Sequence, residues 1–334
     1  MAASSGQDSK TYQLTLVTNS DKHRLLKNVI FVACGVVISS IYTILRNRFD
    51  RRRRRLRGGC GYSQGDLLLN QLFQSRQDID TILNAQYGTR TDDELFHYTK
   101  EGYRSFVERV GVLAERFCEK LKDFTGERGE TTALDIGCLT GGVSFELARS
   151  FQTVYGCDPC KECIRAADAM RSRGWMRCNI IEENDLYFEE TLTLDADIDR
   201  SKVNFAELSF ETSWSNAFKQ PFDCVVAVHA LQRMNSPETL LTSMVDLVAP
   251  HGTCILGCSC DWSEESTPRS HWLGGYVAKD GTPIKSIDTI KTLMSQYFSL
   301  VHEENIPFVT RETSRKLTAS LMSITVWKRD VPSS

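Results

Sequence analysis

The segment Leu134–Gly142, which reads LDIGCLTGG, constrains the fold of this chain more than any other feature. The residues around it predict a strand over Thr132–Ile136 and a helix over Val143–Ser150. Gly137 lets the connecting backbone turn tightly, and Gly141 permits a cofactor or the following helix to approach closely. A strand, a glycine-containing turn and a helix in this order are typical of the ligand-binding edge of an open α/β sheet.

Strands and helices alternate from residue 131 onward. Two segments, 64–84 and 92–122, precede this region and carry apolar residues at the spacing of helices. Further strands are predicted over Thr153–Cys157, Phe222–Val228, Gly252–Cys258 and Ser320–Lys328, and further helices over Lys161–Arg173, Pro237–Val248 and Ile287–Gln296. The alternation predicts an α/β fold with a doubly wound, mainly parallel sheet and helices on both faces.

An acidic residue stands near the end of each of the first two predicted strands of this region. Asp135 precedes the first glycine of the loop, and Asp158 lies 23 residues further along. An acid at the second position can accept hydrogen bonds from both hydroxyls of a ribose. A nicotinamide-binding loop would instead read Gly-x-Gly-x-x-Gly and face a pyrophosphate. The pattern fits a cofactor without phosphate and resembles the class I methyltransferases, although Leu139 stands where many of them have a glycine.

Two segments downstream of the loop carry a more specific resemblance. Asp261–Gly275 ends in HWLGG, and Ile306–Lys316 reads IPFVTRETSRK. With Ala133–Ser150, they resemble the carboxyl-terminal methyltransferase domain of ovothiol-biosynthesis enzymes, the mercaptohistidine N-methyltransferase family, from about residue 85 to 330. The resemblance implies a Rossmann-like class I methyltransferase fold, S-adenosyl-L-methionine as the cofactor, and methylation of an imidazole nitrogen of a thiol-bearing histidine.

The chain departs from that family in two places. The family's domain is commonly fused behind an iron-dependent sulfoxide synthase, whereas a membrane-type segment stands in that place here. The strongly acidic stretch Ile180–Lys202 also interrupts the expected run into the third strand. These departures leave room for a different methyl acceptor on the same fold.

Six residues are expected to bind the cofactor. They are Asp135, Gly137, Cys138 and Gly141 around the methionine end, Asp158 at the ribose, and Glu207, after the acidic stretch, near the adenine. For Glu207 the alternative is a surface glutamate. Methyl transfer is an in-line displacement, so the protein is expected to contribute alignment and desolvation, without a strong general base.

Two further residues are candidates for handling the methyl acceptor. His229 ends the predicted fourth strand and would orient the acceptor or relay a proton, unless it is a strand-end histidine with structural partners. Arg311 would hold an acceptor carboxylate through two hydrogen bonds, or else pair with Glu312 or another acid. Trp262 and Trp272 would wall an aromatic acceptor pocket or fill a core beneath a loop.

The amino-terminal part has a different character from the rest. Residues 1–28 form a tail, Val29–Leu45 is an uncharged apolar run, and 46–63 is an arginine-rich linker to a methyltransferase domain over 64–330. The apolar run is near the lower limit of about 17 residues for a transmembrane helix. A single-pass anchor with the catalytic domain on the cytoplasmic side follows from the positive flank. A signal peptide is disfavoured because an arginine run follows, and a mitochondrial presequence because the run is apolar all round rather than amphipathic. A buried core helix is the remaining alternative.

Charge and cysteine content narrow the function classes. Residues 46–57 carry a local charge of +7, and subtracting it from the net charge of −3 leaves −10 for the rest of the chain. An acidic body is poorly suited to nucleic acid, which we therefore do not expect as a partner. The chain has 12 cysteines, most of them scattered along the sequence, which indicates reduced, buried thiols. Cys157, Cys160 and Cys163 are spaced like metal ligands but lack a fourth, so no metal is expected.

Three functions remain open from the sequence. The leading hypothesis is an N-methyltransferase acting on an imidazole-containing small molecule, similar to mercaptohistidine. The membrane-type segment motivates a second, a membrane-tethered methyltransferase of protein histidines. Leu139 and the acidic stretch motivate a third, a non-catalytic scaffold that binds S-adenosyl-L-methionine. The acceptor and the oligomeric state are left undetermined.

Overall fold

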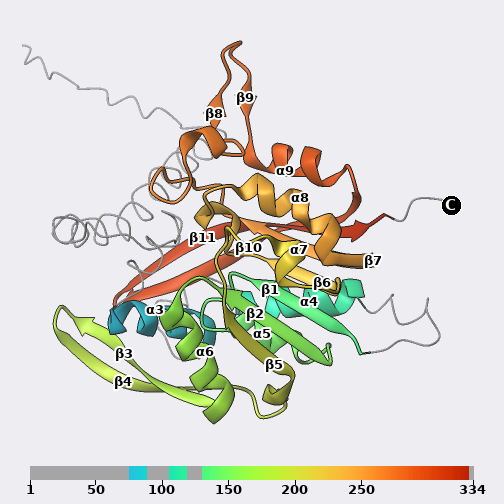
Figure 1. Ribbon diagram of the computed structural model, residues 1–334. Coiled ribbons are helices and arrows are strands. Elements are labelled where there is room, and N and C mark those ends of the chain that lie inside the picture. Colours follow the sequence, from blue (N-terminus) through green and yellow to red (C-terminus); the bar gives the residue numbers. More distant parts are fainter. Residues whose placement is uncertain (1–74, 89–104, 119–129, 331–334) are drawn as a thin grey trace, which may run out of the picture. The chain divides into compact units, whose positions relative to one another are not determined.

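The computed structural model describes residues 75–88, 105–118 and 130–330. Within them, one sheet of seven strands has the order β10-β11-β7-β6-β1-β2-β5 (Figure 1). The five strands from β7 to β5 run parallel to one another, and β11 and β10 are antiparallel at one edge. The strands are β1 (Thr132–Ile136), β2 (Thr153–Asp158), β5 (Val203–Glu207), β6 (Phe222–Ala227), β7 (Val248–Cys258), β10 (Phe298–Thr313) and β11 (Lys316–Arg329).

Helices cover both faces of this sheet (Figure 1). One layer contains α3 (Arg76–Tyr87), α4 (Phe106–Cys118), α5 (Gly142–Leu147) and α6 (Lys161–Arg173). The other contains α7 (Trp214–Ala217), α8 (Pro237–Leu247) and α9 (Ser286–Met294). Short 3-10 turns are η3 (Arg200–Lys202), η4 (Leu231–Arg233) and η5 (Arg269–His271). The predicted α/β fold with a mainly parallel sheet is therefore observed.

The alternation of side chains along the parallel strands produces two hydrophobic cores. In β1, Ala133 faces the core beneath α4 and α5, whereas Leu134 and Ile136 face the core beneath α8. Successive residues of a strand point to opposite faces, and both faces are covered here. This explains why the parallel strands read as continuous apolar runs in the sequence.

The acidic stretch that interrupts the sequence folds as a separate hairpin. Its residues up to Thr193 belong to β3 (Trp175–Glu183) and β4 (Leu186–Thr193), which pair only with each other in the described sheets, and the rest of the stretch follows the hairpin up to the end of η3. Asn184, with φ of +49°, forms the two-residue turn with Asp185, a conformation that asparagine tolerates well. The third parallel strand is β5, so the stretch is an insertion between α6 and that strand.

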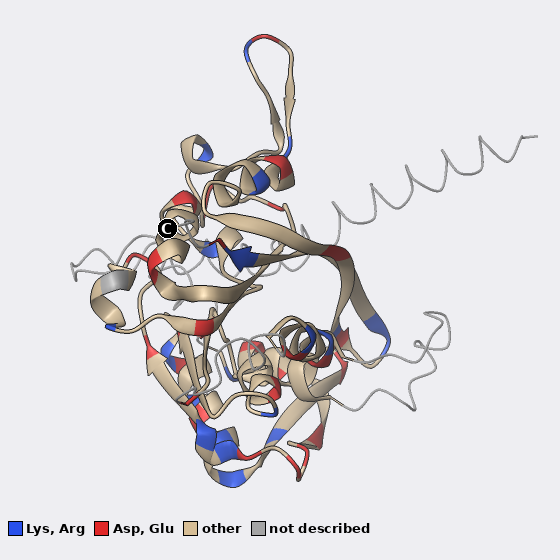
Figure 2. Ribbon diagram, turned by 90° about the vertical axis from the view of Figure 1, so that its right-hand side faces the viewer, with Lys and Arg blue, Asp and Glu red and all other residues tan. Residues whose placement is uncertain are grey.

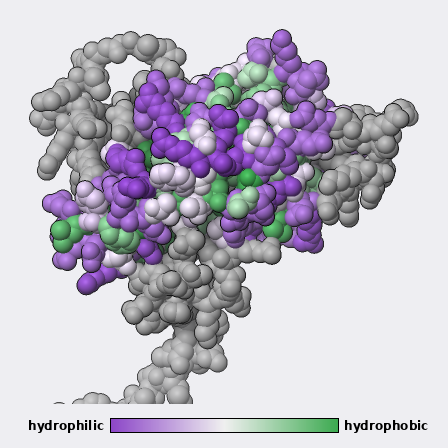
Figure 3. Space-filling model, turned by 90° about the horizontal axis from the view of Figure 1, so that it is seen from below, coloured by the Kyte–Doolittle hydropathy of each residue, from purple (hydrophilic) through white to green (hydrophobic). Residues whose placement is uncertain are grey.

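The hairpin exposes apolar side chains near its turn, at Leu186, Tyr187 and Phe188. Seen from below, the described surface is mostly hydrophilic and carries small hydrophobic patches (Figure 3). Charged residues of both signs are spread over most of the described elements (Figure 2). A second small hairpin is formed by β8 (Tyr276–Val277) and β9 (Pro283–Ile284).

The predicted tail, membrane segment and arginine-rich linker, residues 1–63, lie outside the described residues. Among the helices of 75–88, 105–118 and 130–330, none is long and apolar enough to cross a membrane. The helix predicted over 64–84 is seen from Arg76, after the capping residue Ser75, whose side chain accepts a hydrogen bond from the Asp78 amide at 3.2 Å.

Candidate active site

The glycine loop lies where the carboxyl ends of β1, β2 and β6 are neighbours. The amides of Gly137 and Cys138 both donate to the Cys157 carbonyl, at 2.8 and 3.1 Å, which fixes the loop against the end of β2. Gly137 has φ of +79° and Gly141 has φ of +93°, both in the left-handed region. A left-handed backbone favours glycine, which explains both residues.

Helix α3 fastens the other side of the loop. The side-chain oxygen of Gln86 accepts hydrogen bonds from the Thr140 hydroxyl and from the Gly142 amide, the latter at 3.2 Å. The Tyr87 hydroxyl donates to the Thr140 carbonyl at 2.6 Å. The predicted helix, 64–84, ends before Gln86 and Tyr87, and these contacts were missed because neither residue belongs to a recognisable motif.

Leu139 has a left-handed backbone, a conformation that favours glycine. Its φ is +53°, its side chain is buried in the core, and its amide donates to the Asp158 carboxylate at 3.2 Å. A left-handed leucine costs on the order of 1–2 kcal/mol. The strained residue lies in the candidate site, where local strain is commonly found.

Asp135 is fully buried at the end of β1. The hydroxyl of Ser144, on α5, donates to its carboxylate at 2.7 Å. Burial raises the pKa of the Asp135 carboxyl to about 7, and the nearby Asp158 charge raises it further, against the opposing effect of the Ser144 hydrogen bond. Near neutral pH this group therefore exchanges a proton, and it can act as a donor or as an acceptor.

Asp158 ends β2 and has no exposed surface. Its carboxylate accepts hydrogen bonds from the amides of Leu139 and Cys160, at 3.2 and 2.8 Å, and from Arg233 Nη2 at 3.3 Å. The carboxylate is thus held in place by the glycine loop, by the residue that caps α6 and by a cation. The role of Asp158 as a ribose-binding acid stays a prediction.

Arg233 is a site residue that the sequence analysis missed. It lies in η4, four residues after His229, and its Nε donates to the His229 carbonyl. Its Nη2 also approaches the Gly137 carbonyl at 3.4 Å, and its guanidinium carbon lies 5.3 Å from the centre of the Phe210 ring. Its position just after the end of β6 was the only signal that could have identified it.

His229 follows β6, beside the glycine loop, and is 9% exposed. Its ring lies between Phe106 of α4 and Phe308 of β10, with a centroid separation of 5.0 Å to each. Burial lowers the pKa of His229 to about 3, and the Arg233 charge lowers it further. The imidazole is therefore neutral at physiological pH.

The other predicted site residues differ in how far their side chains are buried. Cys138 is buried in the loop, and burial raises the pKa of its thiol well above the usual value. Glu207 is exposed at the end of β5, in register with Asp158. Arg311 lies on β10, three residues beyond Phe308, and burial lowers the pKa of its half-buried guanidinium. Asp135, Cys138 and Asp158 are thus gathered at the loop, whereas Glu207 lies at the sheet surface.

The two tryptophans fill the protein interior near the Trp-Leu-Gly-Gly segment. Trp262 Nε1 donates to the Ser286 hydroxyl at 2.7 Å, and Trp272 Nε1 donates to the Thr267 carbonyl at 2.9 Å. Both pack on the core beneath α8 and α9. Of the two predicted roles, the structure therefore favours filling a core beneath a loop.

The cysteines of the described regions are free, and all of them except Cys260 are buried. Within those regions no group of three or more His, Cys, Asp or Glu side chains is arranged to hold a metal ion. Cys160 caps α6, its sulfur accepting from the Cys163 amide at 3.4 Å. The Cys157–Cys163 spacing therefore belongs to a strand end and a helix start.

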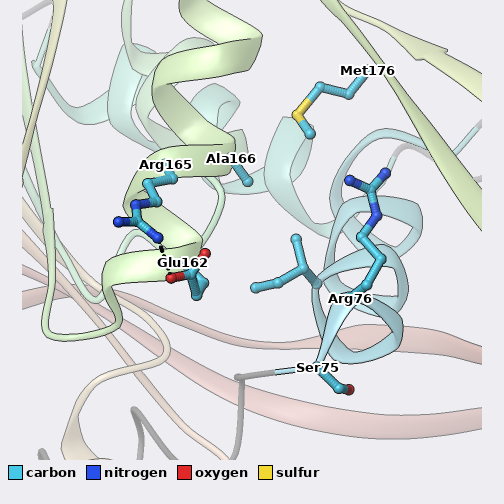
Figure 4. A pocket seen from close by; sticks show the side chains of 7 residues that line it. Ser75, Arg76, Glu162, Arg165, Ala166 and Met176 are labelled. Atoms are coloured by element: carbon cyan, nitrogen blue, oxygen red, sulfur yellow. Dashed lines mark hydrogen bonds and ion pairs between the residues drawn. The ribbon is translucent and has the colours of Figure 1, made fainter.

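A cavity of about 320 Å³ lies apart from these residues, between α3, α6 and β3. Arg76 and Arg165 border it, and Arg165 is paired with Glu162 at its edge (Figure 4). None of the predicted site residues lines it. The candidate site is therefore the loop at the ends of β1, β2 and β6.

Comparison with known proteins gives one family match and a set of structural resemblances. Three of the solved structures that resemble the chain are a magnesium protoporphyrin IX methyltransferase from Synechocystis PCC 6803 with bound SAM, the N-methyltransferase NodS from Bradyrhizobium japonicum WM9, and the [4+2]-cyclase SpnF. Their sequence identities to the chain are 13%, 16% and 13%, and their TM-scores are 0.42, 0.37 and 0.46. The matches cover 81%, 67% and 82% of this chain and 100%, 97% and 100% of the other chains.

No curated protein sequence matches the chain. The family model described as a methyltransferase domain matches residues 101–302, which is more than half of the chain and contains the loop, Asp158, Arg233 and His229. The chain belongs to this family of methyltransferase domains.

Proposed function

We propose that the protein is an S-adenosyl-L-methionine-dependent N-methyltransferase whose acceptor is an imidazole-containing small molecule similar to mercaptohistidine. One observation carries the cofactor assignment. Asp135, the glycine loop and Asp158 meet at the carboxyl ends of adjacent parallel strands, and Asp158 is held by two backbone amides. Ligands of open α/β sheets bind at this edge.

The residues at this edge fit such a cofactor. The buried Asp158 carboxylate presents an acceptor beside a tight backbone turn, and a buried Arg233 nitrogen has no hydrogen-bond partner among the described residues. When bound, S-adenosyl-L-methionine supplies a methyl group on a positively charged sulfur. Asp158 would hold the ribose hydroxyls, and Asp135 with the glycine loop would hold the methionine part.

The chemistry of an imidazole acceptor and the surroundings of His229 are compatible with each other. An imidazole has a reference pKa of about 6.5 and is largely neutral at pH 7, so its methylation needs no strong base. His229, flanked by Phe106 and Phe308, offers a neutral ring in an aromatic setting next to the loop. Such a setting suits an aromatic acceptor and excludes water, which would otherwise solvate the attacking nitrogen.

Calorimetric titration with S-adenosyl-L-methionine tests the cofactor. We expect binding by the full chain and its loss in Asp158→Ala, whose folding is checked by circular dichroism. Incubation with methyl-labelled cofactor and thiolhistidine, histidine or a histidine-containing peptide then identifies the acceptor. Label on thiolhistidine supports the proposal, whereas label on the peptide alone supports a protein methyltransferase.

A second candidate function is a scaffold that binds the cofactor without catalysis. Two observations favour it: the strained Leu139 in the loop, and the pairing of Arg233 with Asp158 where a ribose would bind. Binding of the cofactor without transfer of label to any acceptor tested would support this candidate over the enzyme.

A further inference from the structure

Arg233 is held in the candidate site through two of its three nitrogens. Nε donates to the His229 carbonyl, and Nη2 lies 3.4 Å from the Gly137 carbonyl and 3.3 Å from the Asp158 carboxylate. The side chain is 13% exposed. The guanidinium thus connects the end of β6 to the glycine loop and to the end of β2.

The third nitrogen, Nη1, is buried and has no hydrogen-bond partner among the described residues. A buried N–H donor without a partner costs free energy, because its hydrogen bonds to water are lost and no hydrogen bond in the protein replaces them. A site with an unpaired Nη1 suits a ligand that carries a hydrogen-bond acceptor. A negatively charged hydrogen-bond acceptor forms the strongest pair with a guanidinium.

The hydrogen bonds of Asp158 indicate how a ligand would change this arrangement. A carboxylate has about four lone-pair positions. In Asp158, three of them are taken, by the amides of Leu139 and Cys160 and by Arg233 Nη2. A ribose diol needs two positions, so its binding would release Nη2 from Asp158. Nη1 and Nη2 would then each have an N–H group available for the ligand, in the paired geometry that matches a carboxylate.

The charges nearby permit an additional anion. Arg233 and Asp158 balance each other, and Asp135, whose carboxyl has a pKa of about 7, is partly protonated at neutral pH. A ligand carboxylate that binds Arg233 would therefore not be repelled by two fully ionised aspartates.

We propose that Arg233 binds the carboxylate of an amino-acid ligand through Nη1 and Nη2. This inference rests on the proposed function and deepens it. Two ligands carry this chemistry: the methionine part of S-adenosyl-L-methionine, and an amino-acid acceptor such as a histidine derivative. Arg233 had no assigned role in the sequence analysis, where Arg311 was the residue expected to hold an acceptor carboxylate.

The first arm of the test compares S-adenosyl-L-methionine with its decarboxylated form, which differs only in the carboxylate. Calorimetry measures the ratio of their dissociation constants in the wild-type chain, in Arg233→Gln and in Arg233→Lys. If the cofactor supplies the carboxylate, the wild type prefers the intact form by about 10- to 100-fold, as for a hydrogen bond between charged groups. The ratio falls to about one in Arg233→Gln, and Arg233→Lys keeps part of it.

The second arm compares an amino-acid acceptor with the amine that lacks its carboxylate, thiolhistidine against its decarboxylated analogue. If the acceptor supplies the carboxylate, Arg233→Gln raises the KM of thiolhistidine and leaves that of the amine unchanged. The surface variant Arg165→Gln is the matched control, because Arg165 is exposed and, among the residues that the structure describes, its ion-pair partner is Glu162. A ratio within one variant does not depend on the fraction of folded protein.

The outcomes separate this inference from the proposed function. A carboxylate preference that depends on Arg233 in either arm supports the inference. A wild-type chain that binds S-adenosyl-L-methionine with no such preference in either arm overturns the inference alone. A wild-type chain that binds no S-adenosyl-L-methionine overturns the proposed function and, with it, the inference.

Discussion

The Asp158 carboxylate and the Arg233 guanidinium lie 3.3 Å apart where β1, β2 and β6 end, with Asp158 fully buried and the Arg233 side chain 13% exposed. One partner ends a strand next to the loop, and the other comes from a 3-10 turn 75 residues later in the chain. The pair therefore links the two halves of the parallel sheet at the candidate site. Under the proposed function the pair would contribute to ligand binding as well as to stability, so the two effects have to be measured separately.

Asp158→Asn is expected to destabilise the protein strongly. Asparagine leaves the buried Arg233 cation without an anion, and breaking a buried pair from one side costs about 3–5 kcal/mol of unfolding free energy. Arg233→Gln removes the other partner. The double variant should lose less than the sum of the two single losses, by about 0.5–3 kcal/mol. Urea unfolding followed by circular dichroism measures all three.

The exposed pair of Glu162 and Arg165 is the control for this cycle. Glu162→Gln should change the unfolding free energy by no more than about 1 kcal/mol. Strictly additive losses for Asp158 and Arg233 would show that the two side chains do not interact in solution.

Asp135→Asn is expected to change how stability depends on pH. The Asp135 carboxyl has a pKa of about 7 in the folded protein, against 3.8 as its ordinary value. Between these values the folded protein keeps the proton that the unfolded chain has lost, so this group lowers the unfolding free energy as pH rises from about 4 to about 7. The full effect is at most about 4 kcal/mol. Asparagine removes the titration and still accepts from the Ser144 hydroxyl.

The measurement is urea unfolding of both proteins at pH 5, 6, 7 and 8. Asp135→Asn should gain stability relative to the wild type with each step up to about pH 7 and then level off. His229, with a pKa lowered to about 3, contributes the opposite slope below its ordinary value of 6.5, but equally in both proteins. A constant difference between the two proteins would exclude a raised pKa at Asp135.

Gly141→Ala is expected to destabilise the loop through two effects. The residue has φ of +93°, and an added Cβ would lie 2.5 Å from the Phe205 ring. The backbone conformation alone costs on the order of 1–2 kcal/mol, and the clash adds about 1–3 kcal/mol. Gly281→Ala isolates the first effect, because Gly281 has φ of +87° and nothing within 4 Å of an added Cβ. Thermal unfolding measures the stability lost in each variant. Equal losses would show that the Phe205 ring does not lie against Gly141 in solution.

The parallel core of the fold was predictable because its signals are local. Thr132–Ile136 and Lys161–Arg173 are a strand and a helix with the predicted bounds, since a buried strand is an apolar run and an amphipathic helix has a regular period. Strand β10 was missed because its sequence, with Glu303, Glu304 and Asn305, does not alternate cleanly. Its place in the sheet comes from antiparallel pairing with β11, which is set by tertiary contacts.

The site was predictable only as far as its motif extends. Asp135, Gly137, Gly141 and Asp158 stand at fixed positions relative to two strands, so the fold brings them together. Arg233 and Gln86 reach the loop from a 3-10 turn and from a preceding helix, through long-range contacts that no spacing encodes. The lowered pKa of His229 likewise comes from burial, and the rings that lie against His229, Phe106 and Phe308, are far from it in the sequence.

His229→Phe is expected to separate packing from chemistry at the end of β6. Phenylalanine keeps an aromatic ring between Phe106 and Phe308 and removes both ring nitrogens, so the unfolding free energy should change by less than about 1.5 kcal/mol. Cofactor affinity, measured by calorimetry, should stay within about threefold of the wild-type value, because cofactor binding is assigned to Asp135, Asp158 and the loop. Methyl transfer should slow by about 100-fold or more if a neutral His229 orients the acceptor or relays its proton.

The matched control is His302→Phe. The His302 ring also lies beside a phenylalanine, 5.3 Å from Phe117, but it pairs with Glu304 on β10 and has no assigned part in the site. This variant should transfer methyl groups at the wild-type rate. Because His229 stays neutral at every pH above about 4, the wild-type rate should show no step from its titration between pH 5 and 8. Equal transfer rates in His229→Phe and His302→Phe would make His229 a packing residue and leave acceptor alignment to the neighbouring groups.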